Sequence, residues 1–296
     1  MGARVVVGVL HPGEMGAAVG ACLTGCGHRV VWASAGRSTA TSARAVAAGL
    51  SDVASLTEVV RQADVVFSVC PPQAAVGVAR SVAGFRGVYV DANAVSPATT
   101  REIAQAVTTG GASYVDGGII GPPPHTPGTT RLYLSGRQAA GVADLFTGST
   151  LEAVIIGDEP GQASALKMAY AAWTKGTAAL LLTIRALARA EGVEEALLSE
   201  WRLSQAALLD RSLGAADSAT AKAWRWTSEM REIADSMAAH GLPRGFHEAA
   251  AAIYGRLPPP DTPAGTGDTL SHVIGVLLGE GVSGPGPGGA DRGPAR

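Results

Sequence analysis

The residue best suited to chemistry in this chain is a lysine inside an apolar helix. The chain has three lysines and twenty arginines, and two of the lysines, Lys167 and Lys175, fall in the Ala- and Leu-rich, proline-free stretch 161–190. That stretch predicts one helix of about eight turns, with Lys167, Tyr170 and Thr174 on one face. An apolar environment disfavours the charged form of lysine, so Lys167 is a candidate general acid or base. The alternative is that Lys167 reaches water from an exposed helix end.

A second candidate site is the turn that follows the apolar run 5–10. A Gly-x-Gly-x-x-Gly run between a strand and a helix holds the pyrophosphate of a dinucleotide at the helix N-terminus. Here His11 replaces the first glycine, whereas Gly13 and Gly16 match the second and third. The second glycine lets backbone approach phosphate, and the third allows close packing of helix and strand. We assign to cofactor binding the residues His11, Pro12, Gly13, Glu14 and Met15, with a plain structural turn as the alternative.

The residues after the predicted strand 28–33 indicate which dinucleotide binds. An NAD site requires an acidic side chain there for the ribose 2′-hydroxyl, and none follows this strand. Arg37 stands there instead, flanked by Ser34 and Ser38, and these donors suit a 2′-phosphate. The pattern favours NADP(H) over NAD(H), with a solvated surface arginine as the alternative.

The loop after the predicted strand 64–70 is the third part of the expected cofactor site. It contains Cys70, Pro71 and Pro72. Loops at this place in a dinucleotide-binding sheet cover the ribose and nicotinamide, so we include all three residues, with the prolines shaping the loop.

These sites require an alternating α/β fold followed by helices. Strands are expected at 5–10, 28–33, 64–70, 87–91, 113–116, 131–135 and 154–157, and helices at 14–24, 39–48, 56–62, 71–82, 97–107 and 138–146. The alternation predicts a Rossmann-type, doubly wound, mostly parallel sheet. After Gly161 the pattern is helical, with helices expected at 161–190, 194–213 (ended by Gly214), 218–240, 245–256 and 268–278.

This pattern predicts two domains and a tail. Residues 1–158 form the NADP-binding domain and residues 159–280 form an all-helical domain for substrate and dimerisation, joined by the long helix. Residues 281–296 are rich in Gly and Pro and are expected to be a disordered tail. A rigid connector is expected at 258–263, which contains four prolines.

Composition excludes several classes of function. A net charge of −2 gives no basis for binding nucleic acid through phosphates. Arg185 and Arg189 interrupt the longest apolar stretch, so no membrane span is expected. The cysteines Cys22, Cys26 and Cys70 show neither metal spacing nor a disulfide framework, which indicates a reducing cytoplasm and no metal site.

Five runs of residues together resemble the β-hydroxyacid dehydrogenase superfamily, which includes 6-phosphogluconate dehydrogenase. They are residues 8–16, 68–72, 91–97, 116–118 and 161–167, in the family's order. The resemblance covers residues 5 to 176. The second half is similar to a less characterised branch with its own phosphogluconate-dehydrogenase-like C-terminal domain.

The resemblance implies particular residues and partners. Lys167 matches the family's catalytic lysine, and Asn93 and Ser96 would lie near the nicotinamide and the substrate carboxylate. Gly117 and Gly118 would present backbone N–H groups to that carboxylate. Tyr170 and Thr174 are added as candidate substrate contacts, and the helical half implies a homodimer. The family usually has Asn four residues after the lysine, where this chain has Ala171, so the substrate class cannot be copied across.

The sequence therefore predicts an NADPH-dependent oxidoreductase that transfers a hydride between nicotinamide and a small carbonyl or hydroxy acid, with Lys167 as general acid/base. One alternative is an imine reductase, in which the hydride goes to C=N. Another, from a different class, is a non-catalytic NADP-binding sensor or scaffold.

Overall fold

The computed structural model describes two compact units. The described residues are 5–259 and 268–280. The first unit comprises those up to Gly176 together with Arg225–Ala251, and the second comprises Thr177–Trp224 together with the described residues from Ala252 onwards. Because compact packing does not by itself define a domain boundary, the boundary expected at residue 158 stays a prediction.

The first unit is built on one eight-stranded sheet in the order β3-β2-β1-β4-β5-β6-β7-β8. The strands are β1 (Val6–Val9), β2 (Arg29–Trp32), β3 (Ser51–Asp52), β4 (Val65–Ser68), β5 (Val88–Asp91), β6 (Ser113–Ile120), β7 (Thr130–Ser135) and β8 (Leu151–Gly157). All neighbouring strands are parallel except β6 and β7. The order reverses beside β1, which confirms the predicted doubly wound, mostly parallel sheet.

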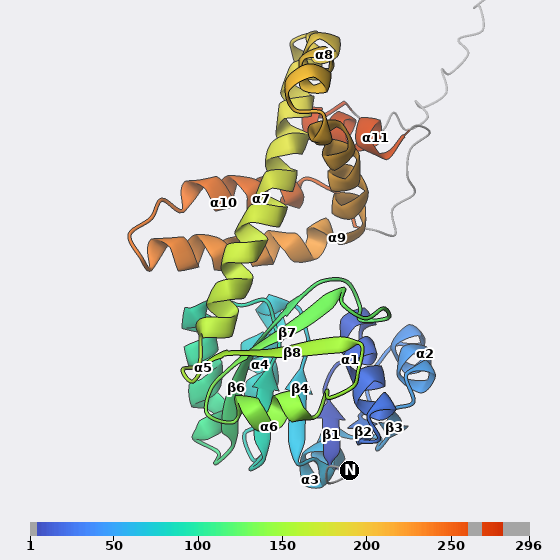
Figure 1. The fold of residues 1–296 in the computed structure, drawn as a ribbon, viewed down its shortest axis with the longest axis vertical. Helices are drawn as coiled ribbons and strands as arrows, with labels where there is room; N and C mark the ends of the chain where they lie inside the picture. The colour runs from blue at the N-terminus through green and yellow to red at the C-terminus, as the bar shows by residue number, and fades with distance from the viewer. Residues whose placement is uncertain (1–4, 260–267, 281–296) are drawn as a thin grey trace, which may run out of the picture. The chain divides into compact units, whose positions relative to one another are not determined.

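Helices cover both faces of this sheet (Figure 1). They are α1 (Glu14–Gly25), α2 (Thr39–Ala47), α3 (Leu56–Gln62), α4 (Pro72–Ser81), α5 (Pro97–Thr108) and α6 (Ala139–Asp144). Successive strand residues enter different cores because side chains alternate across a strand. In β4, Val65 and Phe67 pack in the core that includes α1 and α6, whereas Val66 packs in the core that includes α3, α4 and α5. Burial on both faces explains the continuous apolar runs in the sequence.

The described chain after β8 contains helices and no strand, as predicted. These are α7 (Gln162–Ala190), α8 (Glu194–Ser204), α9 (Ala207–Ala238), α10 (Gly245–Gly255) and α11 (Thr269–Leu278). The expected tail at 281–296 and residues 260–263 of the expected connector lie outside the described residues.

Two neighbouring helix boundaries predicted from the sequence were wrong. One helix was expected to end before Gly214 and the next to begin at residue 218, but α8 ends at Ser204 and α9 runs from Ala207 through Gly214. The break falls at Gln205, whose backbone leaves the helical region with φ −147°. Glycine inside a helix costs about 1 kcal/mol relative to alanine, yet it keeps its N–H group and so does not force an end.

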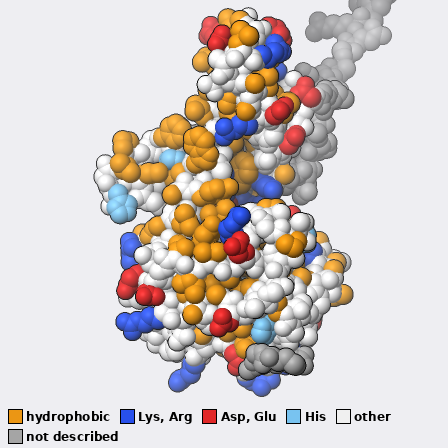
Figure 2. Space-filling view, in the orientation of Figure 1, with side chains coloured by type: hydrophobic (Ala, Val, Ile, Leu, Met, Phe, Trp, Pro, Cys, Tyr) orange, Lys and Arg blue, Asp and Glu red, His pale blue; other side chains and the backbone are white. Residues whose placement is uncertain are grey.

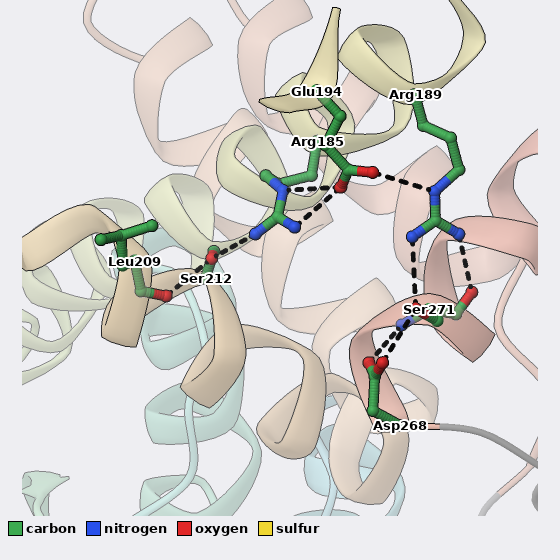
Figure 3. A network of polar contacts seen from close by, with 7 residues as sticks. All are labelled: Arg185, Arg189, Glu194, Leu209, Ser212, Asp268 and Ser271. Carbon is green, nitrogen blue, oxygen red and sulfur yellow. Dashed lines mark hydrogen bonds and ion pairs between the residues drawn. The ribbon is translucent and has the colours of Figure 1, made fainter. Parts of the chain in front are cut away.

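The second unit contains a network of polar side chains among its helices (Figure 3). Arg185 is 8% exposed and donates to Glu194 at 2.7 and 3.1 Å and to Ser212 at 3.0 Å. Arg189 contacts the same carboxylate at 3.4 Å and also reaches Ser271 of α11. Arg185 and Arg189 of α7 therefore link this helix to its neighbours α8, α9 and α11, which explains why an apolar helix carries two arginines.

Candidate functional site

The start of α7 is held by one buried carboxylate, that of Asp116 in β6. It is fully buried and accepts hydrogen bonds from the backbone N–H groups of Gly161 at 2.8 Å and Ser164 at 2.9 Å. The Ser164 hydroxyl donates to it at 2.6 Å, and the Ser135 hydroxyl at 3.1 Å. A carboxylate at a helix N-terminus satisfies unpaired donors and complements the helix dipole. Asp116 thus fixes where α7 leaves the sheet.

This anchor places Lys167 against the far end of β6. The Lys167 amine donates to the carbonyl of Ile119 at 2.6 Å. A Cβ on Gly118 would lie 3.2 Å from the Cβ of Lys167 and 2.7 Å from the carbonyl oxygen of Ala163. Gly118 is therefore required for the lysine stem to lie on the strand. A Cβ on Gly117 would likewise meet the carbonyl oxygen of the preceding strand at 2.9 Å.

The environment of Lys167 changes its acidity. Burial lowers the pKa of the amine to about 8, and the positive charge of Arg225 lowers it further in the same direction. Both protonation states are then accessible near neutral pH, as a group that donates and accepts a proton requires.

The face of α9 within the first unit brings further polar groups to this end of the sheet. Glu229 forms an ion pair with Lys175, whose amine lies 5.6 Å from the ring centroid of Trp226. The Ser228 hydroxyl donates to the side chain of Gln73 at 3.0 Å. Sequence reasoning did not assign these residues to the site. The α9 residues among them recur at helical spacing, which was the signal that the sequence offered. That spacing predicts that they share one face of a helix but not what the face contacts.

Ser96 caps α5, as its position before Pro97 predicts. Its hydroxyl accepts from the backbone N–H of Thr99 at 3.2 Å. Its own backbone N–H donates to the carboxylate of Glu232 of α9 at 2.7 Å. The hydroxyls of Thr100 and Ser164 lie 2.7 Å apart and join the first turns of α5 and α7. Ser96 and Lys167 therefore belong to the same end of the sheet.

Asn93 joins the ends of β4 and β5. It is 2% exposed, its side-chain oxygen accepts from the backbone N–H of Cys70 at 2.6 Å, and its amide group donates to Ser68 and Asp91. These bonds give Asn93 a structural role, and its predicted contact with the cofactor stays a prediction. Burial raises the pKa of Asp91 to about 7 and that of the Cys70 thiol to about 12, which disfavours the thiolate form of Cys70. Pro71 and Pro72 begin α4.

The predicted phosphate turn leads into a helix start that no side chain caps. Gly13 begins α1 with no side-chain cap, and a Cβ added to it would meet no atom within 4 Å. A Cβ on Gly16 would clash with the carbonyl oxygen of His11 at 2.1 Å. Donors at the open helix end can therefore face an anion, and the helix packs closely on the turn. Pro12 is buried, Met15 packs against the core, and Glu14 is exposed in the first turn.

A pocket of about 410 Å³ adjoins this turn. It is lined by Leu10, His11, Arg37, Leu56, Ala74, Gly77, Val78 and Ser81. The guanidinium of Arg37 donates to the carbonyl of Leu10 at 3.1 Å. Burial, with the Arg37 charge adding to it, lowers the pKa of His11 to about 4, so its imidazole is neutral at physiological pH. A basic, partly apolar pocket beside the turn fits the adenosine end of a dinucleotide.

The other two members of the predicted phosphate cluster have local partners. The Ser38 hydroxyl accepts from the backbone N–H of Thr41 and caps α2. The backbone N–H of Ser34 donates to the carboxylate of Asp52 at 3.2 Å. Sequence reasoning missed Asp52, which lies in the two-residue strand β3. Of Ser34, Arg37 and Ser38, it is Arg37 that lines the pocket beside the phosphate turn.

The remaining predicted residues lie along α7. Tyr170 is 46% exposed, and the Thr174 hydroxyl donates to the Tyr170 carbonyl at 3.1 Å, as an ordinary bond within a helix. Ala171 is 1% exposed and packs where the family usually has Asn. The predicted substrate contacts of Tyr170 and Thr174 stay predictions.

Among the described residues, no cluster of three or more His, Cys, Asp or Glu side chains could hold a metal ion. Nor does this part of the chain contain a helix with the length and apolar character needed to cross a membrane.

Comparison with known families matches both parts of the chain. Residues 6–141 match the NAD binding domain of 6-phosphogluconate dehydrogenase, and residues 188–257 match a domain of unknown function, DUF1932. An uncharacterized 28.5 kDa protein in the 7S RNA 5′ region of Methanothermus fervidus is 32% identical over 165 residues. That alignment spans 55% of this chain and 63% of the relative, so it covers less than two thirds of the relative's length.

Solved structures extend the likeness over most of the chain. A conserved protein of unknown function, described as structurally similar to 3-hydroxyacid dehydrogenases, is 30% identical with a TM-score of 0.64, covering 85% of this chain and 99% of that one. Mycobacterium tuberculosis 3-hydroxyisobutyrate dehydrogenase shares the fold at 21% identity and a TM-score of 0.67, covering 93% and 99%. A reductive aminase from Aspergillus terreus, solved with NADPH, shares it at 20% and 0.55, covering 86% and 93%.

The fold and the site thus define an NAD(P)-binding protein with a hydroxyacid dehydrogenase-like architecture. The chain belongs to the 6-phosphogluconate dehydrogenase-like superfamily of β-hydroxyacid dehydrogenases, in a branch that carries the DUF1932 domain. This confirms the family resemblance.

Asp116→Asn is expected to lower the free energy of unfolding by about 2–4 kcal/mol, because the new amide group cannot accept from the N–H groups that begin α7. Urea unfolding followed by circular dichroism measures the loss. Asp144→Asn is the matched control, since Asp144 is exposed on α6. Equal stabilities of Asp116→Asn and the wild type would show that Asp116 does not hold the helix.

Proposed function

We propose that the protein is an NADP(H)-dependent oxidoreductase that transfers a hydride between nicotinamide and a small carbonyl compound or hydroxy acid. The observation that carries this proposal is the buried amine of Lys167, with its pKa near 8, in a member of a dehydrogenase superfamily. The nicotinamide supplies or accepts the hydride when it is bound. Lys167 donates a proton to the substrate oxygen during reduction and removes one during oxidation.

Lys167→Met is expected to lower kcat/KM for NADPH oxidation by about 10²–10⁴-fold, because it removes the proton donor. Calorimetry should show NADPH binding within about twofold of the wild type. A pH profile supplies a second readout. Since the reductive step uses the protonated amine, its rate should fall as pH rises through about 8, and the oxidative step should show the opposite dependence.

Lys222→Met is the control, because Lys222 is the one lysine of the chain outside α7. Full activity of Lys167→Met on an identified substrate would exclude Lys167 as the acid/base. A wild-type protein that binds NADPH tightly and turns over no substrate would instead support the sensor alternative.

NADP(H) is proposed over NAD(H) because Arg37 lines the pocket beside the phosphate turn. Arg37→Ala should weaken NADPH binding by about 10–100-fold and NADH binding by less than threefold, since only NADPH carries the 2′-phosphate. Fluorescence titration of both nucleotides measures this. Arg44→Ala, on the exposed surface of α2, is the control. Equal losses for both nucleotides would assign Arg37 to the shared part of the cofactor.

A homodimer is proposed on the apolar face of α7. Its exposed large apolar residues are Leu166, Tyr170, Trp173, Leu180 and Leu187. They recur at spacings of four, three, seven and seven residues, which is the heptad pattern of a helix that packs on another helix. Figure 2 shows hydrophobic side chains gathered along α7. Sedimentation velocity at micromolar concentration should give the mass of two chains, and Trp173→Glu should shift it towards one. A one-chain mass for the wild type would refute the proposal.

A cytoplasmic location is proposed because the cysteines are free thiols and odd in number.

A further inference from the structure

A carboxylate of the protein itself lies at the head of α5. One oxygen of Glu232 accepts the backbone N–H of Ser96 at 2.7 Å and the hydroxyl of Thr99 at 2.9 Å. Both groups belong to the N-terminal turn of α5, where the helix dipole favours negative charge. This is the position at which the family resemblance implies that a substrate carboxylate is anchored. The anion-binding capacity of Ser96 is therefore already used.

Lys175, which is already paired, does not neutralise the negative charge of Glu232. Lys175 forms an ion pair with Glu229, one turn before Glu232 on the same face of α9. The amine of Lys167 donates to the Ile119 carbonyl. A substrate carboxylate at Ser96 would have to displace Glu232 or lie beside it. Two adjacent carboxylates repel each other, which disfavours binding of the substrate.

We infer that Glu232 is a specificity-determining residue that closes the head of α5 to carboxylates. This inference rests on the proposed function and narrows it. The substrate presents no carboxylate to Ser96 and is an uncharged ketone, aldehyde or imine. Selection of this kind acts by placing a repulsive group against the competing ligand. The burial of Ala171, where the family's amide would otherwise contact substrate, agrees with a changed substrate class.

Matched substrate pairs test this directly. Methyl pyruvate and pyruvate differ by one negative charge on a C=O substrate, and 2-methyl-1-pyrroline and 1-pyrroline-2-carboxylate do so for C=N. We expect the wild type to favour the uncharged member of a pair by about 100-fold in kcat/KM for NADPH oxidation. Glu232→Gln keeps the shape and an acceptor oxygen while removing the charge. It should reduce this preference at least about 10-fold, mainly through a lower KM for the acid.

Glu248→Gln is the matched control, because Glu248 lies on α10 in an exposed ion pair with Arg244. A binding measurement that does not depend on turnover accompanies the kinetics. Calorimetry on the NADP⁺ complex compares oxamate with methyl oxamate in the wild type and in Glu232→Gln. We expect oxamate to bind at least about 10-fold more tightly to the variant, with methyl oxamate unchanged.

Two results would overturn the inference. One is a wild type that prefers the acid of each pair. The other is a ratio of kcat/KM, or of affinity, between the charged and the uncharged compound that is the same in the wild type and in Glu232→Gln. Failure of both oxamate and methyl oxamate to bind either protein counts as the same result. Failure of the proposed function looks different, because neither member of any pair would then oxidise NADPH while the calorimetric comparison would still report on Glu232.

Discussion

The structure of the candidate site depends on the buried carboxylate of Asp116. A charge without solvent is tolerated only when it is fully hydrogen-bonded, and the N–H groups at the start of α7 supply that bonding together with two serine hydroxyls. The interaction is reciprocal, because the helix start needs an acceptor as much as the carboxylate needs donors. It sets the origin and direction of α7, and Lys167 follows one turn later. The position of Lys167 is thus decided by the hydrogen bonds of a carboxylate in β6.

The two ends of the site use helix termini in different ways. At α1 the first turn has no side-chain cap, and the open space beside Gly13 leaves room for a phosphate at the helix N-terminus. At α5 two backbone donors are already paired: the N–H of Thr99 donates to the Ser96 hydroxyl, and the N–H of Ser96 donates to Glu232. The two helix termini therefore differ in how far their backbone donors are already paired within the protein. The difference lies in whether another element of the fold reaches the helix end.

Local signals were sufficient for much of the fold. Apolar runs bounded by glycine and proline located seven of the eight strands, and Ser96 before Pro97 predicted a helix start because capping is a local interaction. Two errors have physical causes. β3 has two residues, Ser51 and Asp52, too few for a hydrophobic pattern. The helix end expected at Gly214 failed because glycine weakens a helix without removing its hydrogen bonds.

The sequence by itself determined the class of fold, the phosphate turn, and Lys167 as the unusual charge in an apolar helix, since each depends on residues close together in the chain. The tertiary structure alone decided what surrounds them. Asp116 lies 51 residues before Lys167, and Glu232 lies 136 residues after Ser96. A hydrogen bond acts over about 3 Å in space, so the sequence pattern does not reveal one between residues this far apart in the chain. The sequence therefore predicted the candidate residue Lys167, whereas the contacts that hold Lys167 and Ser96 in place came only from the packing of distant elements.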